Sequence, residues 1–197
     1  MVENFETSFD LTSLSNHSQI ELKGFHFCSK DLILKYREKI VKILTLRKKY
    51  TDPIRAQIQN FQNSHKVLLG VHIRKNDFKE FYDGQFYHSC EVYRRHIKNF
   101  ISFFNDPSDV GIVICTDDLS ALDSFLDFRP MTPQGNVAQD IFALSECDYI
   151  LSTKATTMSA WAAYYNNRPI FKISGDYLPQ SIDEFKTLGL LDSRDMF

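Results

Sequence analysis

The chain of 197 residues has few cysteines and none of the spacings that mark metal or redox motifs. Its four cysteines, Cys28, Cys90, Cys115 and Cys147, are scattered and form no CxxC pair. Scattered cysteines of this kind are typical of reduced thiols inside cells rather than of a disulfide framework. We therefore expect reduced, structural thiols and no metal site built on them.

Long hydrophobic runs and an excess of one charge are also missing. No apolar run approaches the length of a membrane span, and the opening "MVENFETSFDLTS" is too polar and acidic for a signal peptide. The net charge of −2 and the pI of about 6.3 disfavour a broad nucleic-acid surface but leave room for a local basic pocket. We expect a cytoplasmic protein without a transmembrane segment that binds no nucleic acid.

Three common catalytic signatures are absent as well. The sequence contains no Walker A motif and no GxGxxG, which disfavours an NTPase or a dinucleotide-binding enzyme. It also contains no GxSxG, so an α/β-hydrolase would lack its nucleophile elbow.

From Lys66 onward, apolar runs rich in β-branched residues alternate with segments of helical period. Strands are predicted at 66–73, 110–116, 147–153 and 168–174, and helices at 89–104, 119–126, 138–146 and 156–167. Such alternation is typical of a parallel sheet covered by helices on both faces. The predicted fold class is therefore α/β, with a Rossmann-like parallel sheet and flanking helices.

The region before Lys66 has a different pattern. Residues 1–28 are polar and suggest an irregular arm, and Ser29 is a candidate N-cap for a helix that runs to "RKKY" (47–50). "TDP" predicts a break, with Pro53 opening a shorter helix through Phe61. We divide the chain into an N-terminal region, 1–65, and a nucleotide-binding domain, 66–197.

Ligands bind beyond the carboxyl ends of the strands in open parallel sheets, which directs attention to three junctions. These follow Ile73, Thr116 and Thr153, and all three carry polar clusters. The agreement favours a binding site over scattered surface polarity.

At the first junction, His72 and Arg74 lie two residues apart and share one face of an extended segment. Lys75 and Asp77 follow where the strand should end. A guanidinium fork suits phosphate oxygens, so the pair of cations predicts an anion site. An ion pair between Arg74 and Asp77 is an equally good interpretation.

At the second junction, Asp117 and Asp118 allow two interpretations. Paired carboxylates bind Mg²⁺ or Mn²⁺ in many enzymes. Alternatively, one carboxylate caps the following helix while the other orders the site. The sequence shows no further clustered carboxylates, which favours the capping interpretation.

At the third junction, "STKATTMSAW" places hydroxyls before and within the first turn of a helix. Such hydroxyls and backbone N–H groups can cradle a phosphate. Simple capping by Thr156 or Thr157 is the alternative. A cationic strand end in the same sheet strengthens the phosphate interpretation.

Three segments together resemble the motifs of the GT-B fucosyltransferases, particularly the α-1,2 group and the related α-1,6 and protein O-fucosyltransferases. "GVHIRKNDF" is similar to their His-x-Arg-Arg-x-Asp motif, "ICTDD" to their Ser/Thr-Asp-Asp motif, and "DIFALSECDYILSTKATTMSAWAAYY" to their third motif. The order of the motifs agrees over about residues 66–173, and three ordered motifs are more specific than one.

The resemblance implies the donor-binding half of a GT-B glycosyltransferase that moves fucose from GDP-fucose to a glycan hydroxyl, with inversion, without a metal and without a cofactor. Arg74 would grip the β-phosphate. The catalytic candidates are Arg74 and Asp77, and the candidate substrate-binding residues are His72, Lys75, Asp117, Asp118, Asp140, Thr156, Thr157 and Ser159.

Four features depart from these enzymes. Asn76 replaces a residue that is often glycine, and "TTMSAW" replaces "STFSWW" of the α-1,2 group. Lys75 stands where they carry a second arginine, and residues 1–65 form a short acceptor side. The acceptor half could therefore be reduced, or supplied by a partner domain or a second copy of the chain. Transfer of another sugar, or a non-catalytic nucleotide-binding or interaction domain, are the alternative functions.

Overall fold

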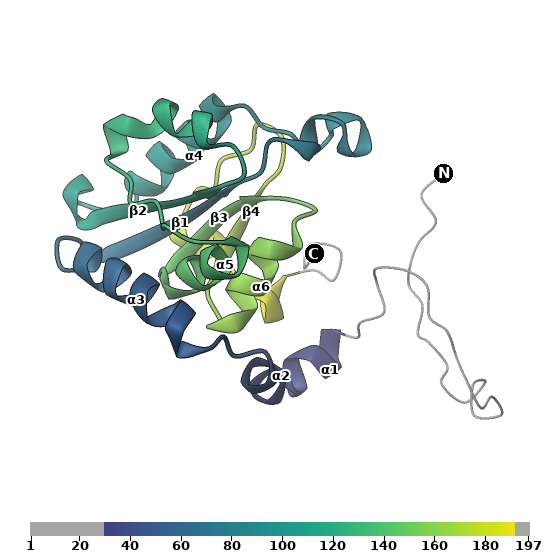
Figure 1. Cartoon of the computed structure of the whole chain (residues 1–197). Coiled ribbons are helices and arrows are strands. Elements are labelled where there is room, and N and C mark those ends of the chain that lie inside the picture. Colours follow the sequence, from purple (N-terminus) through teal and green to yellow (C-terminus); the bar gives the residue numbers. More distant parts are fainter. Residues whose placement is uncertain (1–29, 192–197) are drawn as a thin grey trace.

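The computed structural model describes residues 30–191 and shows a four-stranded sheet in the order β2-β1-β3-β4 (Figure 1). Every neighbouring pair of strands is parallel. The strands are β1 (Val67–Ile73), β2 (Val110–Thr116), β3 (Tyr149–Thr153) and β4 (Ile170–Ile173). All four predicted strands exist, and the predicted α/β class with a parallel sheet is confirmed.

Helices cover both faces of the sheet because each strand is apolar on both sides. On one face, a buried hydrophobic cluster joins the sheet to α3 (Lys48–Gln62), α5 (Val137–Glu146) and α6 (Thr157–Tyr165). On the other face, a second cluster joins it to α4 (Cys90–Ile101) and the 3₁₀ helix η5 (Leu119–Phe128). Figure 1 shows α4 on the opposite side of the sheet from α3, α5 and α6.

The N-terminal helices differ from the prediction. The first described helices are α1 (Lys30–Lys35) and α2 (Arg37–Ile43). The helical structure is interrupted at residues 44–47, so the predicted helix ends before "RKKY" rather than at it. The predicted break at "TDP" is wrong, because Pro53 lies inside α3. The predicted N-cap Ser29 and the predicted arm at 1–28 lie outside the described residues.

Tertiary packing explains why α3 continues through its proline. Pro53 lacks one N–H donor early in the helix, which costs helical stability. Ile54 and Ile58 follow at helical spacing, and both are buried in the cluster that contains Phe142 and Leu144 of α5. The apolar face therefore holds the helix in place. The boundary between residues 65 and 66 stays a prediction.

Short 3₁₀ helices form most of the remaining connections. They are η2 (Asp77–Lys79), η3 (Phe81–Gly84), η4 (Pro107–Asp109), η6 (Ile182–Glu184) and η7 (Leu188–Leu190). The segment predicted as a short helix at 119–126 is helical, but as the 3₁₀ helix η5. Within the described range, no helix combines the length and apolar character needed to cross a membrane.

Candidate functional site

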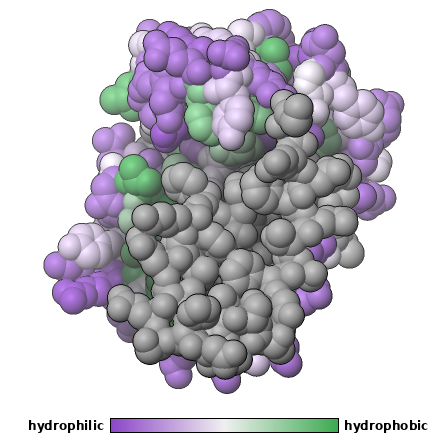
Figure 2. All heavy atoms as spheres, turned by 90° about the vertical axis from the view of Figure 1, so that its right-hand side faces the viewer, coloured by the Kyte–Doolittle hydropathy of each residue, from purple (hydrophilic) through white to green (hydrophobic). Residues whose placement is uncertain are grey.

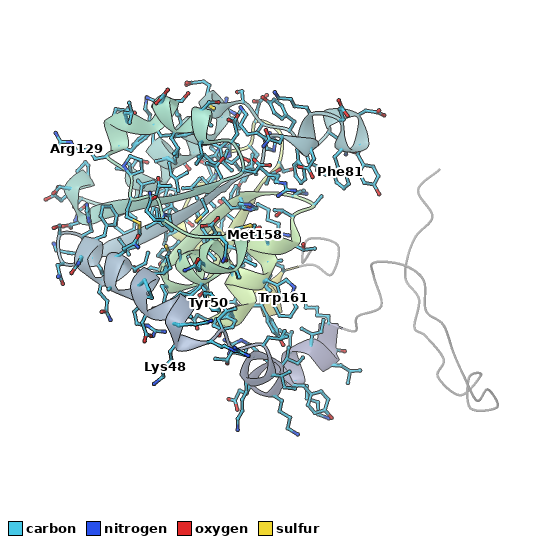
Figure 3. The ribbon with its side chains drawn as sticks, in the orientation of Figure 1. Lys48, Tyr50, Phe81, Arg129, Met158 and Trp161 are labelled. Carbon is cyan, nitrogen blue, oxygen red and sulfur yellow. The ribbon has the colours of Figure 1, made fainter. Side chains whose placement is uncertain are left out.

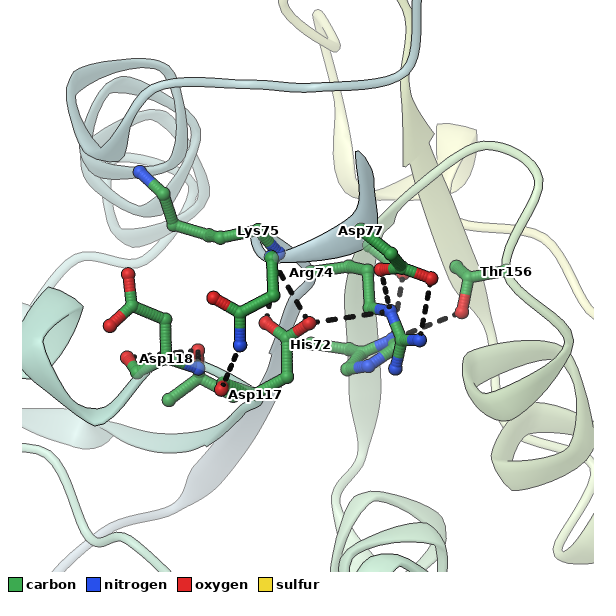
Figure 4. A network of polar contacts seen from close by, with 10 residues as sticks. His72, Arg74, Lys75, Asp77, Asp117, Asp118 and Thr156 are labelled. Carbon is green, nitrogen blue, oxygen red and sulfur yellow. Dashed lines mark hydrogen bonds and ion pairs between the residues drawn. The ribbon is translucent and has the colours of Figure 1, made fainter. Parts of the chain in front are cut away.

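The register of the sheet brings the three predicted junctions to one edge. Ile73 at the end of β1 pairs with Thr116 at the end of β2, and His72 pairs with Ser152 near the end of β3. The polar residues that follow these strands therefore lie together at the carboxyl edge, as Figure 4 shows. The sequence prediction that this edge gathers the polar clusters is confirmed.

Arg74 is held by two carboxylates at the end of β1. Its Nε donates to Asp77 Oδ1 at 2.8 Å and one terminal nitrogen donates to Asp77 Oδ2 at 2.9 Å, while Asp117 Oδ2 lies 3.4 Å from Nε. The hydrogen bonds to Asp77 raise the pKa of Arg74, and the same bonds lower the pKa of Asp77. The predicted ion pair exists, and 35% of the Arg74 side chain remains exposed.

Asp117 orders the backbone where β1 ends. Its carboxylate accepts from the backbone N–H groups of Lys75 at 2.8 Å and Asn76 at 3.3 Å. The Asn76 side-chain amide returns a hydrogen bond to the Asp117 carbonyl at 2.6 Å. These three bonds tie the ends of β1 and β2 together and fix the position from which Arg74 extends.

Asp118 is the N-cap of η5. Its Oδ1 accepts from the Ser120 backbone at 3.1 Å and from the Ser120 hydroxyl at 2.6 Å. One aspartate therefore caps the helix and the other orders the site, which confirms the capping interpretation. Residues 30–191 hold no group of three or more histidine, cysteine, aspartate or glutamate side chains placed to bind one metal ion.

Lys75 points away from Arg74. The Lys75 ammonium lies 3.4 Å from Cys90 Sγ and 4.9 Å from the centre of the Tyr87 ring, on the opposite side of the strand end (Figure 4). Successive residues of extended chain face opposite sides, so Arg74 shares the face of His72 and Lys75 does not. The structure therefore does not bring the second cation beside Arg74, where an anion site is predicted.

His72 is buried and neutral. Its Nδ1 lies 3.4 Å from the Thr156 hydroxyl and 3.5 Å from the Ser152 hydroxyl. Burial, assisted by the charge of Arg74, lowers the pKa of His72 to about 4. We infer that the hydroxyls donate to Nδ1, which places the imidazole proton on Nε2.

Thr156 occupies the N-cap position of α6 without capping it. Its side chain makes no capping hydrogen bond and lies against His72 instead, after Ala155 in a left-handed conformation with φ of 57°. Capping by Thr156 is therefore wrong. Thr157 is exposed at the first helical position, whereas Ser159 is fully buried and donates to the Thr156 carbonyl at 3.4 Å.

Asp140 lies in the first turn of α5, near the end of β2. Its backbone carbonyl is 3.7 Å from Cys115 Sγ, and burial raises the pKa of its carboxyl group to about 6. Among the hydrogen bonds of the described residues, none joins the Asp140 side chain to Arg74 or His72. Asp140 therefore shares the edge but not the polar network.

Three contributing residues were not among the predicted site residues. Asn76 ties β1 to β2, and Ser152 approaches His72 from β3. Phe78 places its ring 5.9 Å from the Arg74 guanidinium. An asparagine directly after a strand is a turn signal that could have drawn attention to Asn76. Ser152 begins the hydroxyl cluster "STKATTMSAW", but its approach to His72 becomes apparent only from the strand register.

Comparison with known proteins gives a similarity of fold. No protein-family model and no curated protein matches the chain. The structure is similar to that of NodZ α-1,6-fucosyltransferase soaked with GDP-fucose, with a TM-score of 0.54 and 16% identity. That match covers 75% of this chain and 50% of the NodZ chain, so the chain spans about half the length of NodZ. A selenomethionine NodZ from Bradyrhizobium gives a TM-score of 0.46 at 14% identity, over 78% of this chain and 64% of that one.

Proposed function

We propose that the chain is a glycosyltransferase domain that binds a nucleoside diphosphate sugar, GDP-fucose in the first instance, at the carboxyl edge of its sheet. The observation that carries the proposal is Arg74, a guanidinium fork fixed at a strand end beside His72 and the N-terminus of α6. The three fucosyltransferase-like motifs and the fold similarity to NodZ support the choice of donor.

The proposed diphosphate lies between Arg74 and α6. The guanidinium binds the β-phosphate, which competes with Asp77 for the fork. The first backbone N–H groups of α6 and the Thr157 hydroxyl are proposed to bind the same anion. His72, with its proton on Nε2, donates a neutral hydrogen bond to the nucleotide. Asp140 contacts the ribose or the base.

Transfer is proposed to proceed with inversion and without a divalent cation. As the bond between C1 of the sugar and the β-phosphate oxygen breaks, negative charge grows on GDP and positive charge on the sugar ring. The acceptor hydroxyl oxygen forms the new bond to C1 from the opposite face and releases its proton to solvent. Arg74 stabilises the phosphate charge more as it grows, which lowers the barrier. Asp77 contacts Arg74, so its role in this geometry is to position the fork.

The direct test is thermal stabilisation of the chain by GDP, GDP-fucose, UDP and ADP. GDP and GDP-fucose should raise the melting temperature, and UDP and ADP should not. No response to any of the four would overturn the proposal. Equal responses to all four would support the alternative of a transferase that uses another nucleotide sugar.

A binding module without transfer is the second candidate. It is favoured by the orientation of Lys75, which leaves one cation where the similar enzymes carry two, and by the closed pair of Arg74 and Asp77. Release of GDP from GDP-fucose in the presence of a glycan acceptor panel separates the two candidates. GDP binding without GDP release would identify the module.

The acceptor side is proposed to lie partly outside residues 66–197. The chain spans about half of NodZ, so a partner domain or a second copy of the chain is the proposed source of further acceptor contacts. Sedimentation of the chain with and without GDP-fucose measures whether it acts as a monomer.

A further inference from the structure

A cluster of aromatic rings follows the candidate donor site along the chain. We define the aromatic rim as Phe78, Phe81, Tyr82 and Phe86. Phe78 stacks on Phe81 with ring centres 5.3 Å apart, Phe81 meets Tyr82 edge-on at 4.7 Å, and Tyr82 lies 6.0 Å from Phe86. Phe78 is buried, but Phe81 is 39% exposed and Tyr82 is 69% exposed.

The backbone fixes the outer rings toward solvent. Tyr82, Asp83 and Gly84 all adopt left-handed conformations, with φ of 48°, 53° and 74°. Bulky residues rarely adopt this conformation, and it persists where the surroundings impose it. Here the far end of the segment is anchored by Thr153, whose hydroxyl donates to the Phe86 carbonyl at 2.8 Å. Figure 3 shows Phe81 on a segment that projects from the sheet.

The rim is continuous with the site. The Arg74 guanidinium lies 5.9 Å from the centre of the rim's inner ring, Phe78, and direct ring contacts connect Phe78 to the outer rings. A group bound on Phe81 and Tyr82 would therefore lie beside the diphosphate site, not within it.

We infer that the aromatic rim binds the acceptor glycan, with the face of a pyranose ring stacked on Tyr82 and Phe81. One face of a pyranose carries mainly C–H groups and packs on an aromatic ring, while its hydroxyls need acceptors at the edge. Glu80 and Asp83, which flank the outer rings in the sequence, are exposed and carry carboxylates. Figure 2, which views this side of the molecule, shows hydrophilic side chains around apolar ones in its upper part.

An acceptor sugar fits the rim better than the nucleotide base. Small ligands and cofactors bind in pockets that enclose most of their surface. A tyrosine ring that is 69% exposed offers an open surface instead, which suits a glycan lying across the site. The inference rests on the proposed function, because it assigns the occupant of the rim as the acceptor for that reaction.

The test measures glycan binding and GDP binding separately. Saturation-transfer NMR is recorded with cellotriose, chitotriose, maltotriose and N-acetyllactosamine as probes, and GDP binding is followed by thermal stabilisation. Tyr82→Gly removes the ring at a backbone position that glycine adopts readily. Tyr82→Phe keeps the ring, and Tyr36→Ala removes an exposed tyrosine elsewhere, on the α1–α2 connection.

We expect at least one probe to bind the unsubstituted chain, with its ring C–H protons receiving the strongest saturation. Tyr82→Gly should weaken that binding at least fivefold, Tyr82→Phe and Tyr36→Ala should preserve it, and GDP binding should be unchanged in all three. The inference is overturned if no probe binds, if Tyr82→Gly binds as well as the unsubstituted chain, or if Tyr82→Gly loses GDP binding. If Tyr82→Gly weakens glycan binding but GDP stabilises neither the unsubstituted chain nor any variant, the assignment of the aromatic rim is retained and the proposed donor site is rejected.

Discussion

Arg74 donates to Asp77 from Nε and from one terminal nitrogen of its guanidinium, at 2.8 and 2.9 Å, within the same short turn after β1. The carboxylate occupies the geometry that two phosphate oxygens would take. A diphosphate that binds here must therefore exchange with Asp77, or share the fork with it. Because of this exchange, substitutions of Arg74 and of Asp77 should have different effects on GDP binding.

Arg74→Ala should abolish the thermal stabilisation by GDP and lower the rate of sugar transfer by about 10²–10³-fold, because the growing charge on the leaving phosphate loses its fixed donor. Arg74→Lys should recover only part of this loss, since an ammonium lacks the fork. Thermal melting with GDP and single-turnover GDP release measure the two effects.

The matched control for Arg74→Ala is Arg94→Ala. Arg94 forms a similar two-pronged pair with Asp127, at 2.5 and 2.7 Å, between α4 and η5 and away from the strand ends. Arg94→Ala should leave GDP binding intact. If Arg74→Ala and Arg94→Ala behave alike, Arg74 is a structural residue and the phosphate assignment is wrong.

Asp77→Asn should tighten GDP binding while slowing transfer. Removal of the carboxylate charge frees the fork from its competitor, and breaking a partly exposed pair of this kind is worth about two- to fivefold in the dissociation constant. Isothermal titration with GDP measures the first effect and GDP release the second. Weaker GDP binding in Asp77→Asn would mean that the positioning of the fork by Asp77 outweighs its competition with phosphate.

Addition of EDTA should leave both GDP stabilisation and transfer unchanged. The proposed charge stabilisation comes from Arg74, and the carboxylates of Asp117 and Asp118 are engaged by backbone N–H groups. Activity before and after chelation, with Mg²⁺ and Mn²⁺ added back, is the measurement. Loss of activity on chelation that either cation restores would support the alternative interpretation of Asp117 and Asp118 as metal ligands.

The order of strands and helices was predictable because the sheet is buried on both faces. Runs such as 67–73 and 110–116 are apolar throughout, and the carboxyl ends of parallel strands meet at one edge whatever the details of packing. That is why His72, Arg74 and Asp117 could be placed at a common site from the sequence.

The rest depended on tertiary structure. Helix propensity predicts a break at Pro53, but the burial of Ile54 and Ile58 holds α3 together. Thr156 has the sequence context of a cap, but the pairing of β1 with β3 brings His72 within 3.4 Å of its hydroxyl. Alternation along an extended segment already puts Lys75 on the face opposite His72 and Arg74, but its contacts with Cys90 and Tyr87 become apparent only from the structure.

His72 should make the protein less stable as the pH falls from about 6.5 toward 4. Its pKa is about 4 in the folded chain and 6.5 when unfolded, so the unfolded chain binds more protons in this window and gains stability relative to the fold. The full effect is roughly 3 kcal/mol for a fully buried group.

The measurement is urea unfolding at several pH values between 4 and 7.5 for the unsubstituted chain and for His72→Gln, in which that part of the pH dependence should disappear. Asp140 contributes with the opposite sign, because its pKa is raised to about 6 and stability is lost as the pH rises toward that value. Comparison in an Asp140→Asn background separates the two groups. Equal pH dependence with and without His72 would show that the pKa of the imidazole is the same in the folded and in the unfolded chain.

Gly111→Ala should destabilise the fold by about 1–3 kcal/mol, the usual cost of forcing extra volume into a packed core. A β-carbon at Gly111 in β2 would stand 2.7 Å from Leu68 Cδ2 and 2.8 Å from both the Phe61 ring and the His65 ring. The rings are part of the packing between α3 and the sheet, so the added methyl group should loosen that helix. Gly189→Ala is the control, because its nearest neighbour is Leu34 at 3.8 Å, and it should change the free energy of unfolding by no more than about 0.5 kcal/mol. Urea unfolding of both variants measures the difference, and a Gly111→Ala chain as stable as Gly189→Ala would mean that α3 packs on β2 less closely than the structure shows.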